Sequence, residues 1–303
     1  MSTVAERVDV LIVGAGLSGV GAARHLQASL PRRTFTILEA RDAIGGTWDL
    51  FRYPGVRSDS DMYTLGYRFR PWVASQAIAG GPDILRYIRD TAAEGGVERH
   101  VRFGTRVVSA AWSTADARWT VEAVSGGAPV SFTARFLYLC TGYYRYDAGH
   151  EPSFPGQEEF GGTIVHPQHW PGDLDYAGKR VAVIGSGATA VTLVPALARQ
   201  AAHVTMIQRS PSYIAALPAR DRVAERLRGW LGPRRAAAVT RWKNIAYTTA
   251  FYKLSQARPG LVRALLKKGA TRALPPGFQS GYIQRSLHEF PKAGSRGPWR
   301  VVM

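Results

Sequence analysis

Two glycine-rich turns, each set between a short apolar strand and a helix, constrain the fold of this 303-residue chain more than any other feature. The first turn follows the β-branched run DVLIV and contains Gly14, Gly16 and Gly19. Glycines at this spacing form the turn, let the backbone approach a pyrophosphate and let helix and strand pack closely. The free N–H groups at the helix N-terminus then favour phosphate.

The strand expected at residues 34–38 ends in Glu39, 25 residues after Gly14. A carboxylate at this place accepts hydrogen bonds from an adenosine ribose and repels a 2′-phosphate. The first turn therefore predicts a site for FAD or NAD, and an ordinary structural turn is the alternative.

The second glycine turn, GSGATA, contains Gly185, Gly187 and Ala190, and alanine still permits close helix packing. The strand expected at residues 203–208 ends in Arg209, a cation that can bind a 2′-phosphate. The second site is therefore predicted to prefer NADPH. The strand that follows the first turn ends in the acidic Glu39, and the strand that follows the second turn ends in the basic Arg209. These opposite charges favour FAD at the first site and NADPH at the second.

The remaining periodicities predict one helix and a small antiparallel sheet between the two turns. Residues 83–94 have helical spacing, whereas 107–112, 119–124 and 131–140 alternate with a period of two. The predicted fold class is α/β, with two dinucleotide-binding (Rossmann-like) domains, an antiparallel β meander and a C-terminal helical insert. The FAD domain is expected to be incomplete.

Composition limits the class and the partners of the protein. There is no run of about 18 apolar residues and no signal peptide, so a cytoplasmic protein is expected. The single cysteine, Cys140, rules out a CxxC pair and so disfavours a disulfide reductase, and no metal site is expected.

The net charge of +17 is concentrated in the last third of the chain. Residues 209–303 contain 19 Lys and Arg against 3 Asp and Glu, whereas residues 1–208 contain 20 against 19. We expect a helical cap with a solvated cationic face at 218–275, with a weak membrane-surface contact as the alternative and no nucleic-acid partner.

Two segments without clear periodicity contain aromatic residues, glycines and prolines. The loop at residues 45–59 includes Gly46, Trp48 and Tyr53. Its Arg57 and Asp59 can form a charge pair that orients a nicotinamide or a peroxide, and two solvated side chains are the equal alternative. The bridge at residues 160–171, FGGTIVHPQHWP, is a stiff connection between the two glycine turns. From its composition alone, an ordinary surface linker is the simpler interpretation.

Together these motifs resemble the class B flavoprotein monooxygenases, most closely the Baeyer–Villiger type. The bridge matches that family's fingerprint at Phe160, Gly162, His166, Trp170 and Pro171. The loop matches a longer fingerprint at seven positions: Gly45, Gly46, Trp48, Tyr53, Pro54, Gly55 and Asp59. The resemblance covers roughly residues 8–275.

The resemblance implies an FAD- and NADPH-dependent enzyme that oxidises ketones to esters or lactones with O2 through a flavin C4a-peroxide. Oxygenation of amines or sulfides is the neighbouring alternative, and an inactive flavin-binding fragment is another. By similarity, Asp59 would orient an arginine or the nicotinamide near the flavin, and His166 and Trp170 would couple domain rotation to the catalytic cycle. Gly46, Trp48 and Tyr53 would line the cofactor.

The resemblance also implies a division of the chain into five parts. These are an FAD-binding domain at 1–150, a linker at 151–172, the first part of an NADPH-binding domain at 173–217, a basic helical insert at 218–275 and an irregular tail at 276–303. Relatives continue after the insert to complete both domains, so a truncated or frameshifted product that retains FAD weakly is expected.

Overall fold

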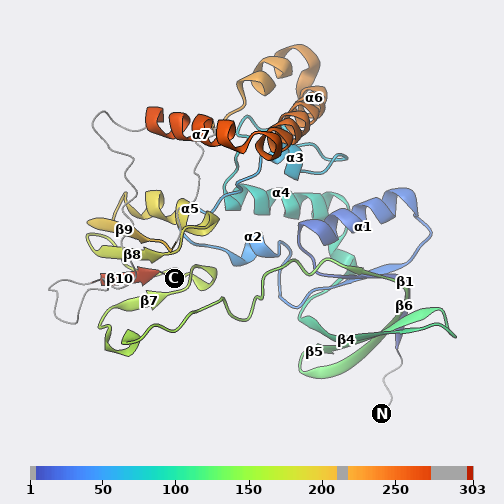
Figure 1. Ribbon diagram of the computed structural model, residues 1–303. Coiled ribbons are helices and arrows are strands. Elements are labelled where there is room, and N and C mark those ends of the chain that lie inside the picture. Colours follow the sequence, from blue (N-terminus) through green and yellow to red (C-terminus); the bar gives the residue numbers. More distant parts are fainter. Residues whose placement is uncertain (1–4, 210–217, 274–298, 303) are drawn as a thin grey trace. The chain divides into compact units, whose positions relative to one another are not determined.

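The computed structural model describes residues 5–209, 218–273 and 299–302 (Figure 1). The chain forms two compact units, the first from Met1–Arg52 with Gly81–Gly149 and the second from Tyr53–Gly80 with His150–Met303. Each unit contains its own β-sheet. The segment Tyr53–Gly80 lies within the stretch 1–150 that was expected to form the FAD domain, yet it packs with the second unit.

The first unit is a six-stranded sheet with helices beside it. Its elements are β1 (Glu6–Val13), α1 (Leu17–Ser29), β2 (Phe35–Leu38), α2 (Thr47–Leu50), α4 (Gly81–Glu94), η1 (Glu98–His100), β3 (Val101–Arg102), β4 (Thr105–Ser113), β5 (Arg118–Ser125) and β6 (Ala128–Leu139). The strand order is β3-β2-β1-β6-β5-β4. Strands β3, β2, β1 and β6 are parallel, and β6, β5 and β4 form the predicted antiparallel meander.

The core of the first unit follows from its apolar strand runs. Leu11 and Ile12 are successive residues of β1, so they point to opposite faces of the sheet, and both are fully buried. This is the double-sided burial that a continuous apolar run in a parallel strand predicts. Helices α1 and α4 contact each other beside this sheet (Figure 1).

The second unit combines a parallel sheet with a helical insert. Its elements are α3 (Met62–Leu65), η2 (Gln157–Glu159), β7 (Thr163–Val165), η3 (Pro167–His169), β8 (Arg180–Ile184), α5 (Ala188–Leu197), β9 (His203–Ile207), α6 (Arg222–Ala257), α7 (Pro259–Ala273) and β10 (Trp299–Val302). All four strands are parallel, in the order β7-β10-β8-β9. Part of the bridge, expected to be a linker, is therefore the strand β7.

The expectation of an irregular tail at 276–303 is wrong for its last described residues. Trp299–Val302 form β10, which lies between β7 and β8 and pairs with both. A four-residue strand that pairs on both sides in a parallel sheet needs no alternation of polar and apolar residues, so WRVV carries no periodic signal. Residues 274–298 lie outside the described residues.

The basic insert forms two helices, as its composition predicts. Helix α6 has a kink at Gly232, where φ is 72°, and Pro233 follows it. Asp221 caps α6 by accepting hydrogen bonds from the amides of Val223 and Ala224, both at 3.0 Å. Among the described residues, no helix is both long and apolar enough to cross a bilayer.

Candidate functional site

In the first unit, the glycine turn and the acidic residue lie side by side at the carboxyl edge of the sheet. Val13 of β1 is in register with Leu38 of β2 and with Leu139 of β6. The next residues, Gly14 and Glu39, therefore follow neighbouring strand ends, about 4.8 Å apart in a regular sheet. Ligands of open α/β sheets bind at this edge.

Glu39 is buried and tied to the glycine turn. Its Oε2 accepts a hydrogen bond from the amide of Ala15 at 2.7 Å, and its Oε1 accepts one from the amide of Arg41 at 3.0 Å. Each carboxylate oxygen has two lone-pair sites, so both oxygens can accept a further bond. The contacts fix the carboxylate at the place where the sequence predicted ribose recognition.

Two glycines of the first turn are required by close packing. A Cβ at Gly19 would lie 1.9 Å from the carbonyl oxygen of Gly14, and a Cβ at Gly14 would lie 2.4 Å from that of Cys140. Gly14 also has φ of 104°, which disfavours any side chain. Gly16 faces Gly46, whose Cα would lie 3.6 Å from a Cβ at Gly16, so the turn contacts the fingerprint loop through backbone atoms.

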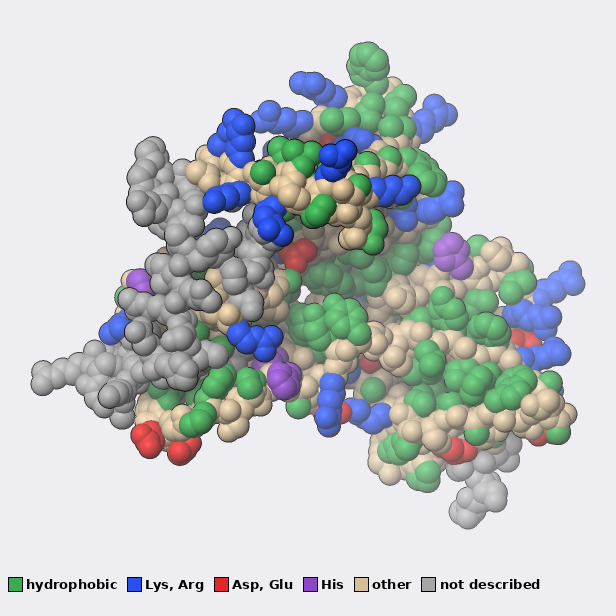
Figure 2. All heavy atoms as spheres, in the orientation of Figure 1, with side chains coloured by type: hydrophobic (Ala, Val, Ile, Leu, Met, Phe, Trp, Pro, Cys, Tyr) green, Lys and Arg blue, Asp and Glu red, His purple; other side chains and the backbone are tan. Residues whose placement is uncertain are grey.

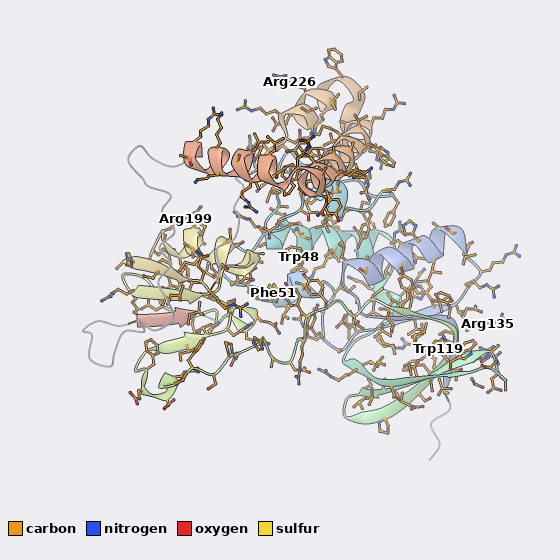
Figure 3. The ribbon with its side chains drawn as sticks, viewed as in Figure 1. Trp48, Phe51, Trp119, Arg135, Arg199 and Arg226 are labelled. Carbon is orange, nitrogen blue, oxygen red and sulfur yellow. The ribbon has the colours of Figure 1, made fainter. Side chains whose placement is uncertain are left out.

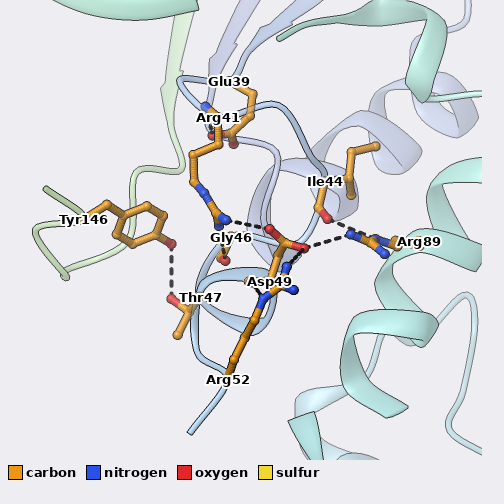
Figure 4. Close-up of polar contacts among 9 residues, drawn as sticks. All are labelled: Glu39, Arg41, Ile44, Gly46, Thr47, Asp49, Arg52, Arg89 and Tyr146. Carbon is orange, nitrogen blue, oxygen red and sulfur yellow. Dashed lines mark hydrogen bonds and ion pairs between the residues drawn. The ribbon is translucent and has the colours of Figure 1, made fainter. Parts of the chain in front are cut away.

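A buried carboxylate surrounded by arginines lies beside this turn and was not predicted (Figure 4). Asp49 of α2 is 2% exposed, and it accepts from Arg41 at 2.6 Å and from Arg89 at 2.8 Å. Arg52 is 3.5 Å from the same carboxylate, and Arg41 also donates to the carbonyl of Gly46 at 3.2 Å. Through Asp49, the cluster links helix α2 with helix α4 and with Arg41, which follows Glu39 by two residues.

Aromatic side chains accompany this cluster. The hydroxyl groups of Tyr146 and Thr47 lie 3.2 Å apart, and Phe51 packs edge-on against Tyr144 with ring centroids 4.9 Å apart. Figure 3 shows Trp48 and Phe51 on and just after α2, and Trp48 is partly exposed. Gly46 lies against Gly16 of the glycine turn, and Trp48 follows it by two residues, whereas no signal in the sequence pointed to Tyr146 beside Thr47.

In the second unit, the carboxyl ends of three strands bring together residues from the bridge and the second turn. Val165 of β7 and Val183 of β8 both pair with Val302, which lies between them. His166 thus follows β7 at the same sheet edge at which Gly185 follows β8. Ile184 is in register with Ile207, so Arg209, which is exposed, follows β9 at this edge too.

The helix of the second turn begins immediately beyond Gly187 and packs against β8. Ala190 is buried, as a small residue at the helix–strand contact requires. Among the described residues, no atom lies within 4 Å of the position that a Cβ would take at Gly185 or Gly187. Gly187 is exposed and Gly185 is partly exposed.

The rest of the fingerprint loop packs on α5 within the second unit. A Cβ at Gly55 would lie 2.9 Å from the Cβ of Ala196, so the loop backbone lies against the helix. Tyr53 is buried, its hydroxyl is hydrogen-bonded to Thr189, and burial raises its pKa. The nearby Arg57 and Asp59 are both exposed, and in the described part of the chain they form no ion pair with each other.

The bridge favours the neutral form of His166. The Nδ1 atom of His166 accepts a hydrogen bond from the amide of Gln168 at 3.2 Å, and burial lowers the pKa of the imidazole. Trp170 is partly buried and packs edge-on against Tyr176, with ring centroids 6.2 Å apart. The bridge is thus an ordered segment with an imidazole acceptor and a fixed indole ring.

Comparison with known proteins identifies the family. Residues 80–224 match a family described as flavin-binding monooxygenase-like, and residues 12–73 match an NAD(P)-binding Rossmann-like domain. FAD-containing monooxygenase EthA of Mycobacterium tuberculosis is 56% identical over 274 residues, which is 90% of this chain. The chain is similar to flavin-binding monooxygenases over most of its length. The resemblance seen in the fingerprints is confirmed by these matches.

Solved structures of two monooxygenases share the fold. A steroid monooxygenase bound to NADP is 35% identical, with a TM-score of 0.64 over 77% of this chain and 43% of that one. A cyclohexanone-bound cyclohexanone monooxygenase is 28% identical, with a TM-score of 0.64 over 73% of this chain and 43% of that one. The chain spans 56% of the length of EthA.

Proposed function

We propose that the chain carries the two cofactor sites of an FAD- and NADPH-dependent monooxygenase, with FAD in the first unit and NADPH in the second. The main observation behind the proposal is that residues of opposite charge follow the second strand of each nucleotide-binding motif. Glu39 follows β2 beside the first turn, and Arg209 follows β9 beside the second. A carboxylate suits a free ribose, whereas a guanidinium suits a 2′-phosphate.

The residues of both turns fit these groups. Within the described parts of the chain, a Cβ at Gly16 would come near Gly46 at 3.6 Å and one at Gly185 or Gly187 would meet no atom within 4 Å, which suits a close approach of each turn to a pyrophosphate. Glu39 keeps acceptor capacity for ribose hydroxyls. The relatives support the same assignment, because EthA is named an FAD-containing monooxygenase and the steroid monooxygenase is bound to NADP.

When bound, FAD takes electrons from NADPH and lets O2 deliver one oxygen atom to an organic substrate while the other leaves as water. The residues of this chain supply binding and orientation. We assign Asp59 and Arg57 to orient the nicotinamide end of the second cofactor, since both lie close to Tyr53 in the loop that packs on α5. His166 and Trp170 are assigned to transmit cofactor binding through the bridge.

We propose ketones as the substrate class and esters or lactones as products, by analogy with the steroid and cyclohexanone monooxygenases. The balanced reaction consumes one ketone, O2, NADPH and a proton and gives the ester, NADP+ and water. Oxygenation of amines or sulfides is the second candidate reaction, since it uses the same two cofactors, FAD and NADPH. The expected location of the protein in the cytoplasm remains a prediction.

Incubation of the FAD-supplemented protein with NADPH and a cyclic ketone, a tertiary amine or a sulfide tests this function. We expect the lactone as the main product and NADPH consumption that depends on the ketone. An Arg209→Ala variant should lose preference for NADPH over NADH while an Arg199→Ala variant keeps it, because Arg199 is an exposed arginine that follows α5. Consumption of NADPH without oxygenation of any of the three compounds would contradict the proposal.

A further inference from the structure

Helices α6 and α7 carry a surface that combines cationic and hydrophobic side chains. From Arg222 to Ala273 the sequence contains 13 Lys and Arg residues and one acidic residue, Glu225. Figure 2 shows blue cationic side chains interspersed with green hydrophobic ones over both helices. None of these side chains has a role in the proposed oxygenation.

The inner face of α6 is already occupied. Its buried residues are Ala224, Ala236, Ala237 and Thr240, and the first and third of these pack in one cluster with Tyr63. Arg241 donates to the carbonyls of Tyr63 and Gly66 at 3.0 and 2.8 Å, and so caps the end of α3. These contacts anchor α6 through one face and leave the opposite face outward.

The outward face of α6 is exposed along its whole length after the kink. Residues separated by alternating steps of four and three share one face of a helix, because a turn has 3.6 residues. Starting at 235, the six residues on this path are all exposed: Arg235, Val239, Trp242, Ala246, Thr249 and Lys253. Trp242 is 64% exposed, and this face contains no acidic side chain.

The same combination occurs before the kink and in α7. Arg226 and Trp230 lie one helical turn apart, and Trp230 is 91% exposed. In α7 the spacing of four, three and four residues places Leu261, Leu265, Lys268 and Arg272 on one exposed face. We call these faces of α6 and α7, residues 226–272 in these helices, the basic-aromatic surface.

We propose that the basic-aromatic surface docks the protein on an anionic lipid bilayer, with the helices lying along the membrane surface. Lys and Arg complement lipid phosphates, and Trp settles at the level of the headgroups. Exposed Leu and Val gain free energy from acyl chains but not from a nucleic-acid backbone, which favours lipid as the partner. This inference goes beyond the proposed oxygenation and does not depend on it.

Co-sedimentation with vesicles tests the charge contribution. The full chain should bind vesicles that contain phosphatidylglycerol, bind pure phosphatidylcholine vesicles far less, and release as NaCl rises. Removing two cations in Arg226→Gln/Arg235→Gln should weaken binding about 25-fold. The control Arg135→Gln/Arg199→Gln makes the same charge change at exposed arginines outside α6 and α7 and should bind as the wild type does (Figure 3).

A second pair of variants tests the aromatic contribution. Trp230→Ser/Trp242→Ser should weaken binding about tenfold, whereas Tyr143→Ser, at an exposed tyrosine after β6, should leave binding unchanged. All these side chains are exposed, so circular dichroism should show an intact fold for each variant. Equal binding to both vesicle types, equal losses in the controls, or binding to a single-stranded oligonucleotide without binding to vesicles would overturn the proposal.

Discussion

Replacing Asp49 by Asn tests whether the arginine cluster stabilises the loop beside the first glycine turn. The substitution keeps the shape of the side chain and removes the charge that faces Arg41 and Arg89. Three guanidinium groups would then lie around a neutral amide, and their mutual repulsion would no longer be offset. We expect the first unit to lose stability.

The magnitude follows from the burial of each partner. Breaking a fully buried ion pair costs about 3–5 kcal/mol. Arg41 and Arg89 are 23% and 47% exposed, so water can solvate them in part once the carboxylate is gone. Arg52 is largely exposed and lies 3.5 Å from the Asp49 carboxylate, so its ion pair contributes little to stability. We therefore expect a loss of about 2–4 kcal/mol.

Native-state hydrogen exchange of the β1 amides measures this loss, because these amides exchange when the first unit unfolds. The expected change is an acceleration of about 30- to 700-fold. Asp83→Asn is the matched control, since the pair of Asp83 with Arg86 at 3.0 Å is exposed and should cost less than about 0.5 kcal/mol. Equal exchange in the two variants would refute the reasoning.

Three further predictions concern single residues. Gly19→Ala, with its Cβ 1.9 Å from a backbone oxygen, should destabilise the protein by at least about 1–3 kcal/mol in thermal unfolding. Gly161→Ala meets no atom of the described residues within 4 Å and should not destabilise it. Burial raises the pKa of Cys140 to about 11, so iodoacetamide should alkylate it on the order of 100-fold more slowly at pH 8 than a free thiol; comparable rates would contradict this. Burial lowers the pKa of His166 in the folded protein, so the unfolded chain binds a proton at this histidine at a higher pH than the folded protein does. The wild type should therefore lose stability relative to His166→Gln as pH falls through about 6.5. Parallel pH profiles for the two proteins would contradict this.

Local patterns predicted much of the fold and of both nucleotide turns. Strand β1, helix α1 and strand β2 follow from an apolar run, glycines at fixed spacing and a second apolar run. The antiparallel meander follows from alternation in residues 107–112, 119–124 and 131–140. Glu39 and the first glycine turn lie together because parallel strands of similar length end at one edge of a sheet.

Contacts between distant segments could not be predicted from such patterns. Arg89 lies 40 residues from Asp49, and nothing in its spacing points to a buried carboxylate. The packing of Gly55 against α5, which joins the loop to the second unit, is likewise a tertiary contact without local signal. Strand β10 is too short for a period, and its place between β7 and β8 depends on pairing across more than a hundred residues.

Ligand-induced protection from hydrogen exchange tests the assignment of one cofactor to each unit most directly. FAD should slow exchange in peptides that cover residues 14–20 and 39–50, and NADP+ should slow exchange in peptides that cover residues 185–190 and the end of β9. A Glu39→Gln variant should lose part of the FAD effect and keep the NADP+ effect. Protection of the same peptides by both cofactors, or of neither set by saturating cofactor, would contradict the account.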